Sequence, residues 1–131
     1  MQSMISQKTQ ELLRQCKTAT IAINRPGRSP QTTPVWCIWQ EEAFYFSTLT
    51  TRATYRNIRR DPAISLIVYD GADFAAAYGK AHIIEHDFTA LVEQIVRRYV
   101  PHEKQQEWAA LLSQPDRVMV KLQPERWTTS S

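Results

Sequence analysis

Hydroxyl and arginine side chains gather in one short segment, STLTTRATYRNIRRDP, which spans residues 47–62. Ser47 and Thr48 close an apolar run, and Thr50 and Thr51 follow immediately. The same segment then carries four arginines: Arg52, Arg56, Arg59 and Arg60. Where a strand ends and a helix begins, hydroxyls, free backbone N–H groups and a guanidinium can converge on one anion. The segment therefore has the residue types of a phosphate-binding site.

Two other interpretations of these arginines stay open on the pattern alone. A run of charge is most often a solvated helix face. Arginines beside Tyr55 and nearby tryptophans could instead form a basic, stacking surface for nucleic acid. The net charge is only +3, and no helix-turn-helix, zinc knuckle or RNP-like strand accompanies the arginines. We therefore expect no nucleic-acid partner.

Other chemistry-bearing residues give little sign of catalysis or metal binding. His82 and His86 are four residues apart in an expected strand, which would separate them by about 13 Å, so we expect no metal site. Cys16 and Cys37 lack CxxC spacing and lie in apolar contexts, which predicts two buried free thiols. No nucleophile motif and no glycine-rich phosphate loop is present, so the catalytic residues stay unknown.

The elements that must position the arginine segment follow from hydrophobic periodicity and turn residues. Six strands are expected, at residues 18–23, 31–40, 41–49, 63–70, 74–87 and 117–127. Four helices are expected, at residues 6–16, 51–61, 87–100 and 103–114. This order predicts a mainly β, α+β chain or an antiparallel barrel with helices filling a gap. We expect one domain, residues 1–131, whose sheet edges are hidden by closure or by dimerisation.

The composition is that of an ordinary globular protein, with 43% hydrophobic and 22% charged residues. No uninterrupted apolar run approaches the roughly 20 residues of a membrane span, and no charged-then-apolar signal opens the chain. Unpaired cysteines are typical of a reducing compartment. We expect a cytoplasmic protein that does not associate with membranes.

Three stretches carry a resemblance to a known family: GRSPQTTPVWCIW, FYFSTLTTRATYRNIRRDPAISLIVYD and AAYGKAHI. They resemble the pyridoxamine 5′-phosphate oxidase-like split-barrel family, and are closest to its small branch that binds FMN or the deazaflavin coenzyme F-420. The match is best over residues 18–84. The resemblance implies a homodimer of six-stranded antiparallel split barrels with flanking helices. Two flavin-type cofactors would then lie in grooves between the protomers.

The resemblance also implies where the flavin ring would lie. The strand that carries Thr33, Pro34 and Val35 would run beside the ring. The loop before the fifth strand, around Phe74, would approach the ring from the partner chain.

A second set of residues would hold the cofactor phosphate: Ser47, Thr48, Arg52 and Thr54. Many relatives have a lysine at the position of Thr54, so this chain lacks the usual point charge there. Hydrogen bonds to charged groups contribute about 1.5–3 kcal/mol, which makes the loss consequential. Three outcomes stay open: Arg56 compensates for the missing charge, the cofactor binds weakly, or it does not bind.

The resemblance implies a flavin- or deazaflavin-dependent oxidoreductase that transfers hydride to or from a small organic substrate at a dimer-interface site. The alternative is a non-catalytic protein that binds flavin or a tetrapyrrole. Pyridoxamine 5′-phosphate oxidation itself is not expected, because the small branch lacks the longer substrate-binding tail.

Overall fold

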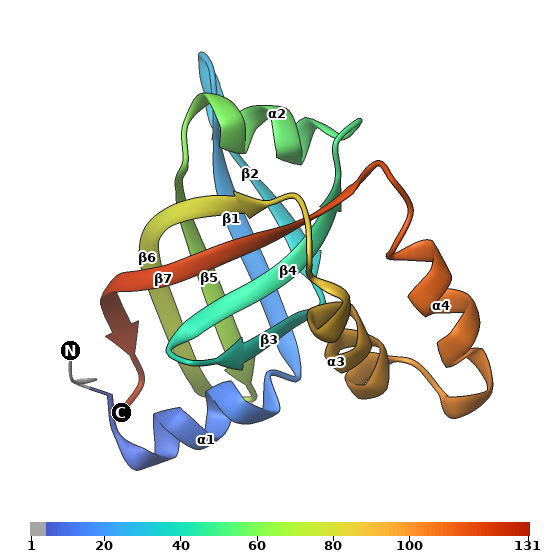
Figure 1. The fold of residues 1–131 in the computed structure, drawn as a ribbon. Helices are drawn as coiled ribbons and strands as arrows, with labels where there is room; N and C mark the ends of the chain where they lie inside the picture. Colours follow the sequence, from blue (N-terminus) through green and yellow to red (C-terminus); the bar gives the residue numbers. More distant parts are fainter. Residues whose placement is uncertain (1–4) are drawn as a thin grey trace.

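The computed structural model describes residues 5–131 of the chain. Its centre is an antiparallel sheet that curls into a half-barrel (Figure 1). The spatial order of the strands is β2-β1-β5-β6-β7-β4-β3. Their bounds are β1 (Thr18–Arg25), β2 (Arg28–Val35), β3 (Cys37–Gln40), β4 (Ala43–Leu49), β5 (Ala63–Asp70), β6 (Asp73–Ile84) and β7 (Arg117–Thr129).

Helices flank the sheet at three places (Figure 1). α1 (Gln7–Gln15) and α2 (Ala53–Arg60) lie at opposite ends of the curled sheet, and α3 (Thr89–Tyr99) and α4 (Gln105–Leu111) lie together at its side. A 3-10 turn, His102–Lys104, precedes α4. α1 starts where the Ser6 side chain accepts a 3.1 Å hydrogen bond from the Thr9 N–H, a standard N-cap. Among the described residues, no helix has the length and apolar character that crossing a membrane requires.

The expectation of six strands was wrong, because seven strands form in the described chain. The expected strand over residues 31–40 divides at Trp36, which belongs to neither β2 nor β3. On one side of the break Val35 pairs with Ala19 of β1, and on the other side Cys37 pairs with Phe46 of β4. One continuous extended run therefore supplies both edges of the sheet.

Two hydrophobic clusters stabilise the fold, one on each face of the sheet. The concave face encloses a cluster that includes Phe44 and Phe46 of β4 and Leu122 of β7, all fully buried. The opposite face of the same strands packs against α3, where Tyr45 and Met119 join the second cluster. Alternate residues of β4 and β7 thus enter different clusters, as the two-residue strand period requires. β4 and the first part of β7, residues 118–120, are buried on both faces, which gives the neighbouring site a rigid base.

Candidate functional site

A cavity of about 450 Å³ lies where the half-barrel fails to close, between edge strand β2 and the pair β4–β7. Residues 33–36 line it from β2 and the break that follows, and residues 46–48 line it from β4. α2, α3 and α4 contribute further side chains. The volume falls within the range of about 300–1,000 Å³ that is usual for small-molecule and cofactor sites.

One end of the cavity is apolar and aromatic. Trp36 and Trp108 lie with ring centroids 5.2 Å apart, and Ile95 and Leu112 complete this wall. Behind Trp36 the Tyr99 ring is stacked in parallel, with centroids 5.4 Å apart and planes inclined by 3°. Trp36 remains 38% exposed despite these contacts. Aromatic side chains that are held from behind and open in front suit a planar, apolar ligand group.

The other end of the cavity is polar and basic. Its side chains come from the end of β4, the start of α2 and the start of β7: Ser47, Thr48, Arg52, Thr54 and Arg117. A tight turn joins β4 to α2, in which the Arg52 N–H donates to Leu49 O. The Thr50 N–H donates to Asp116 O, which connects this turn to the residue before β7. This turn places Arg52 as the N-cap residue of α2. The four phosphate residues expected from the sequence thus line one end of one cavity.

Gln31, which the sequence did not indicate, does not line the cavity but bonds two side chains that do. Its side-chain Nε2 donates to Thr33 Oγ1 at 2.9 Å and to Thr54 Oγ1 at 3.1 Å. The bond to Thr33 lies within β2, and the bond to Thr54 links β2 to α2. Because both hydroxyl oxygens accept from Gln31, each keeps its own hydrogen free to donate to a ligand. No local motif around Gln31 signals this role.

Arg117 is a second residue that the sequence reasoning missed. It pairs with Leu49 across the β4–β7 ladder, and its Nη1 lies 3.5 Å from Ser47 Oγ. Burial lowers the pKa of its guanidinium, the neighbouring Arg52 lowers it further, and Asp116 acts in the opposite direction. Arg117 lies 65 residues beyond Arg52, so only the strand register could have brought the two together.

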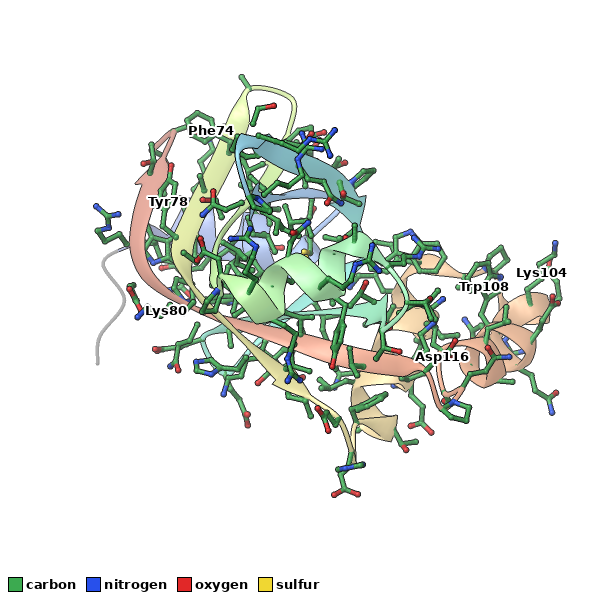
Figure 2. The ribbon with its side chains drawn as sticks, turned by 90° about the horizontal axis from the view of Figure 1, so that it is seen from above. Phe74, Tyr78, Lys80, Lys104, Trp108 and Asp116 are labelled. Atoms are coloured by element: carbon green, nitrogen blue, oxygen red, sulfur yellow. The ribbon has the colours of Figure 1, made fainter. Side chains whose placement is uncertain are left out.

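Arg56 and Phe74 lie outside the residues that line the cavity. The Arg56 guanidinium donates to Thr51 O at 3.0 Å and is exposed on α2. Phe74 lies at the start of β6, on the opposite side of the molecule from Trp108 and Asp116 (Figure 2). Within one chain, Phe74 is therefore too remote to contact a ligand in this cavity.

Tyr99, which stacks behind Trp36, is held in place by hydrogen bonds between its hydroxyl and the backbone of Cys16 and Cys37. The Tyr99 hydroxyl lies 2.6 Å from Cys16 O and 2.7 Å from Cys37 O, and it accepts from the Cys37 N–H at 3.1 Å. Burial raises the pKa of the Tyr99 hydroxyl far above its ordinary value, with the two cysteines adding to the rise. The expectation of two buried free thiols is confirmed. The hydrogen bond that the Cys37 thiol donates to Cys16 raises the pKa of Cys37, and burial raises it further.

In the part of the chain that the structure describes, no three His, Cys, Asp or Glu side chains gather in a way that could hold a metal ion. The residues that line the cavity include no Asp, Glu, His, Cys or Lys. The arrangement can thus bind an anion and a planar group, and it offers no general acid or base of its own.

The structure combines a curled antiparallel half-barrel with an amphipathic cavity at its opening. The sequence model of pyridoxamine 5′-phosphate oxidase matches residues 5–131. The chain belongs to this family, and the resemblance inferred from its sequence is confirmed. No curated protein matches the chain.

Solved structures with the same fold include proteins of different character. A conserved hypothetical protein from Mycobacterium tuberculosis superposes with a TM-score of 0.79 at 20% identity, over 98% of this chain and 88% of that one. An F-420 reductase gives 0.75 at 24% identity, over 95% and 98%. HutZ, the heme storage protein from Vibrio cholerae, gives 0.74 at 16% identity, over 93% and 92%. At these identities the likeness concerns the fold.

Proposed function

We propose that this protein binds a flavin-type coenzyme, FMN or deazaflavin F-420, in the cavity at the barrel opening. We further propose that it uses the coenzyme as an oxidoreductase that transfers hydride to or from a small organic substrate. The observation that carries the proposal is the two-ended cavity, basic and hydroxyl-rich at one end and aromatic at the other. A phosphorylated, ring-bearing coenzyme has the same division between its two ends.

The chain's residues fit the two ends of such a coenzyme. Hydroxyls of Ser47, Thr48 and Thr54 donate to phosphate oxygens, and Arg52 supplies charge in a planar fork. Thr33 and Val35 on β2 run beside the ring, while Trp36 and Trp108 cover it and exclude water. When bound, the coenzyme ring supplies the hydride chemistry, and the protein supplies orientation and electrostatics. A cavity without an acidic or basic catalytic side chain is consistent with a reaction that the coenzyme itself carries out.

The proposal extends to the assembly: the whole chain, residues 1–131, is one flavin-binding domain that works as a homodimer. Phe74 lies far from the cavity of its own chain (Figure 2), so it can approach the ring only from a partner chain. The sheet also presents a face of small and apolar side chains opposite the concave cluster, including Thr20, Ile67 and Ala76, which pair across β1, β5 and β6. A second chain would cover this face.

A direct test is a titration of the apoprotein with FMN and, separately, with F-420, followed by tryptophan fluorescence. Saturable quenching is expected, because Trp36 and Trp108 line the cavity. Trp108→Phe should remove part of the quenching. Trp127→Phe should retain it, because Trp127 packs on Trp39 in the sheet and does not line the cavity. Absence of saturable quenching with both coenzymes would contradict the proposal.

The alternative function is a non-catalytic carrier of flavin or of a tetrapyrrole, favoured by the absence of the usual lysine at Thr54. A measurement of redox turnover of the bound coenzyme distinguishes the oxidoreductase from the carrier. A bound coenzyme that reduced nicotinamides reduce, and that organic acceptors then reoxidise, supports the oxidoreductase. A coenzyme that binds but never changes redox state, or tight binding of haem in place of flavin, supports the carrier.

A further inference from the structure

Arg117 and Arg52 form an unusual pair at the basic end of the cavity, because neither has an acidic partner. In the described part of the chain, the ion pairs involve neither guanidinium. Arg117 Nε is buried and makes no hydrogen bond, although guanidinium N–H groups are strong donors. Among residues 5–131, its side chain makes one hydrogen bond, a long one of 3.5 Å from Nη1 to Ser47 Oγ. A buried donor without an acceptor is unfavourable, and an anion bound beside it would satisfy it.

The electrostatic interaction between Arg52 and Arg117 also favours a bound anion. The pKa of Arg117 is lowered by burial and then by Arg52, which means that the two like charges repel each other. Asp116 opposes this effect through its charge without forming an ion pair. An anion between the two guanidiniums would remove the repulsion and satisfy the buried Nε at once.

The start of α2, like the two arginines, lacks negatively charged partners. Its N-cap residue is Arg52, whose side chain cannot accept a hydrogen bond, and the structure shows no side-chain cap bond there. The first turn of the helix contains no acidic residue. The first N–H groups of α2 and its positive dipole end are therefore open to a ligand, next to two guanidiniums.

We propose that Arg117 is the second cation of the phosphate site and that, together with Arg52, it selects a dianionic phosphate monoester. Arg117 then supplies, from the far end of the chain, the charge that the usual lysine at the position of Thr54 would supply. This inference rests on the proposed function. It favours FMN, whose phosphate is a monoester with close to two negative charges at neutral pH. The phosphate of F-420 is a diester with one charge.

The test compares FMN with riboflavin, which has the same ring and no phosphate. Dissociation constants are measured by tryptophan quenching for the wild type, Arg117→Gln and Arg117→Lys. We expect Arg117→Gln to weaken FMN binding about ten- to a hundredfold, in line with a lost charged hydrogen bond, and to leave riboflavin binding unchanged. Arg117→Lys keeps the charge without the fork, so its FMN affinity should fall in between.

Arg14→Gln is the matched control. Arg14 lies on α1, at the other end of the molecule from α2, and pairs only with Glu11 on the surface (Figure 1). Its substitution removes the same charge and should leave the ratio of FMN to riboflavin affinity unchanged. The amide that Arg117→Gln introduces can still donate to Ser47, and denaturant unfolding of each variant verifies that its fold is intact.

Inorganic phosphate provides a readout that does not depend on flavin. Phosphate should raise the melting temperature of the wild type above that in chloride of equal ionic strength, and Arg117→Gln should lose this increase. If Arg117→Gln binds FMN and phosphate as the wild type does, the inference is overturned while flavin binding stands. If the wild type binds F-420 more tightly than FMN, the selection of a monoester is overturned. If it binds no flavin at all, the proposed function falls as well.

Discussion

Gln31 controls the direction in which two cavity hydroxyls can donate. It occupies the oxygen of Thr33 and that of Thr54 with its two amide hydrogens, so the hydroxyl hydrogens must point elsewhere. Thr54 is only 7% exposed, and its side chain cannot turn freely toward solvent. The site is thus partly organised for an acceptor-rich ligand before any ligand arrives, which lowers the entropic cost of binding.

Substitution of Gln31 by Ala should weaken FMN binding about two- to tenfold, because a neutral hydrogen bond contributes about 0.5–1.5 kcal/mol. Without Gln31, the hydroxyls of Thr33 and Thr54 can rotate and donate less well to the phosphate. Riboflavin has no phosphate, so its affinity should change less than that of FMN. Fluorescence titration measures both. Gln15→Ala, on the exposed end of α1, is the control. Equal FMN affinities for the two variants would show that Gln31 does not position the site.

The sequence predicted the local part of this site and missed its distant part for a physical reason. Ser47, Thr48, Arg52 and Thr54 lie within eight residues, so a strand-to-helix junction is enough to bring them together. Arg117 and Gln31 reach them only through strand pairing and across the gap in the barrel. The sequence around a single arginine or glutamine in a strand does not indicate which residues of other strands or helices it will contact.

Strand pairing also explains why the boundaries of residues 31–40 could not be read from the sequence. The run is extended throughout, and both halves are compatible with strand periodicity. Its two halves exchange one partner strand for another at Trp36. The sequence changes there from mostly polar to apolar residues, but a single strand that runs into the core would show the same change. The strand over residues 63–70, by contrast, was predicted with its observed bounds, because Gly71 and Pro62 flank a continuous apolar run.

The β6–β7 ladder depends on one glycine at its irregular point. The register shifts between Tyr78 and Gly79, and a Cβ on Gly79 would lie 2.7 Å from Gln123 O and 3.1 Å from Leu122 Cδ1. The first of these contacts is with backbone of the paired strand, which cannot move away without disturbing the ladder. Gly79 is therefore required by close approach of two strands.

Gly79→Ala should lower the free energy of unfolding by about 1–3 kcal/mol, the usual cost of overpacking a tight contact. Urea unfolding followed by far-UV circular dichroism measures the change. Lys80→Ala is the neighbouring control, because Lys80 is exposed on the same strand. A Gly79→Ala midpoint equal to that of the control would mean that the ladder accommodates the methyl group.

The Tyr99 hydroxyl ties the end of α1 and the start of β3 to α3. Tyr99→Phe should destabilise the fold by about 1–3 kcal/mol, because the Cys37 N–H loses its acceptor inside the protein. The phenylalanine ring of the variant would still stack on Trp36. Urea unfolding provides the measurement, and Tyr55→Phe is the control, because the Tyr55 hydroxyl accepts only from the exposed Arg59. Equal stability of the two variants would show that water replaces the lost hydroxyl.

The molecule as a whole has a sheet that is covered unevenly. The concave face holds one cluster, and α3 covers the outside of β3, β4 and β7. The outside of β1, β5 and β6 has no helix over it in Figure 1. There Thr20 pairs with Ile67, and Ile67 pairs with Ala76, so small and apolar side chains form one continuous strip. A contiguous strip of this kind is typical of an interface.

Ile67→Glu tests the proposed homodimer at this strip. We expect the wild type to sediment at twice the 15.2 kDa mass of the chain, and the variant to sediment as a monomer, because a buried, unpaired carboxylate opposes association. FMN affinity should fall with the dimer, since Phe74 could then no longer approach the ring from a partner. Gln7→Glu adds the same charge to an exposed position of α1 and should leave the dimer intact. A wild type that sediments at 15.2 kDa while binding FMN fully would place the whole site within one chain.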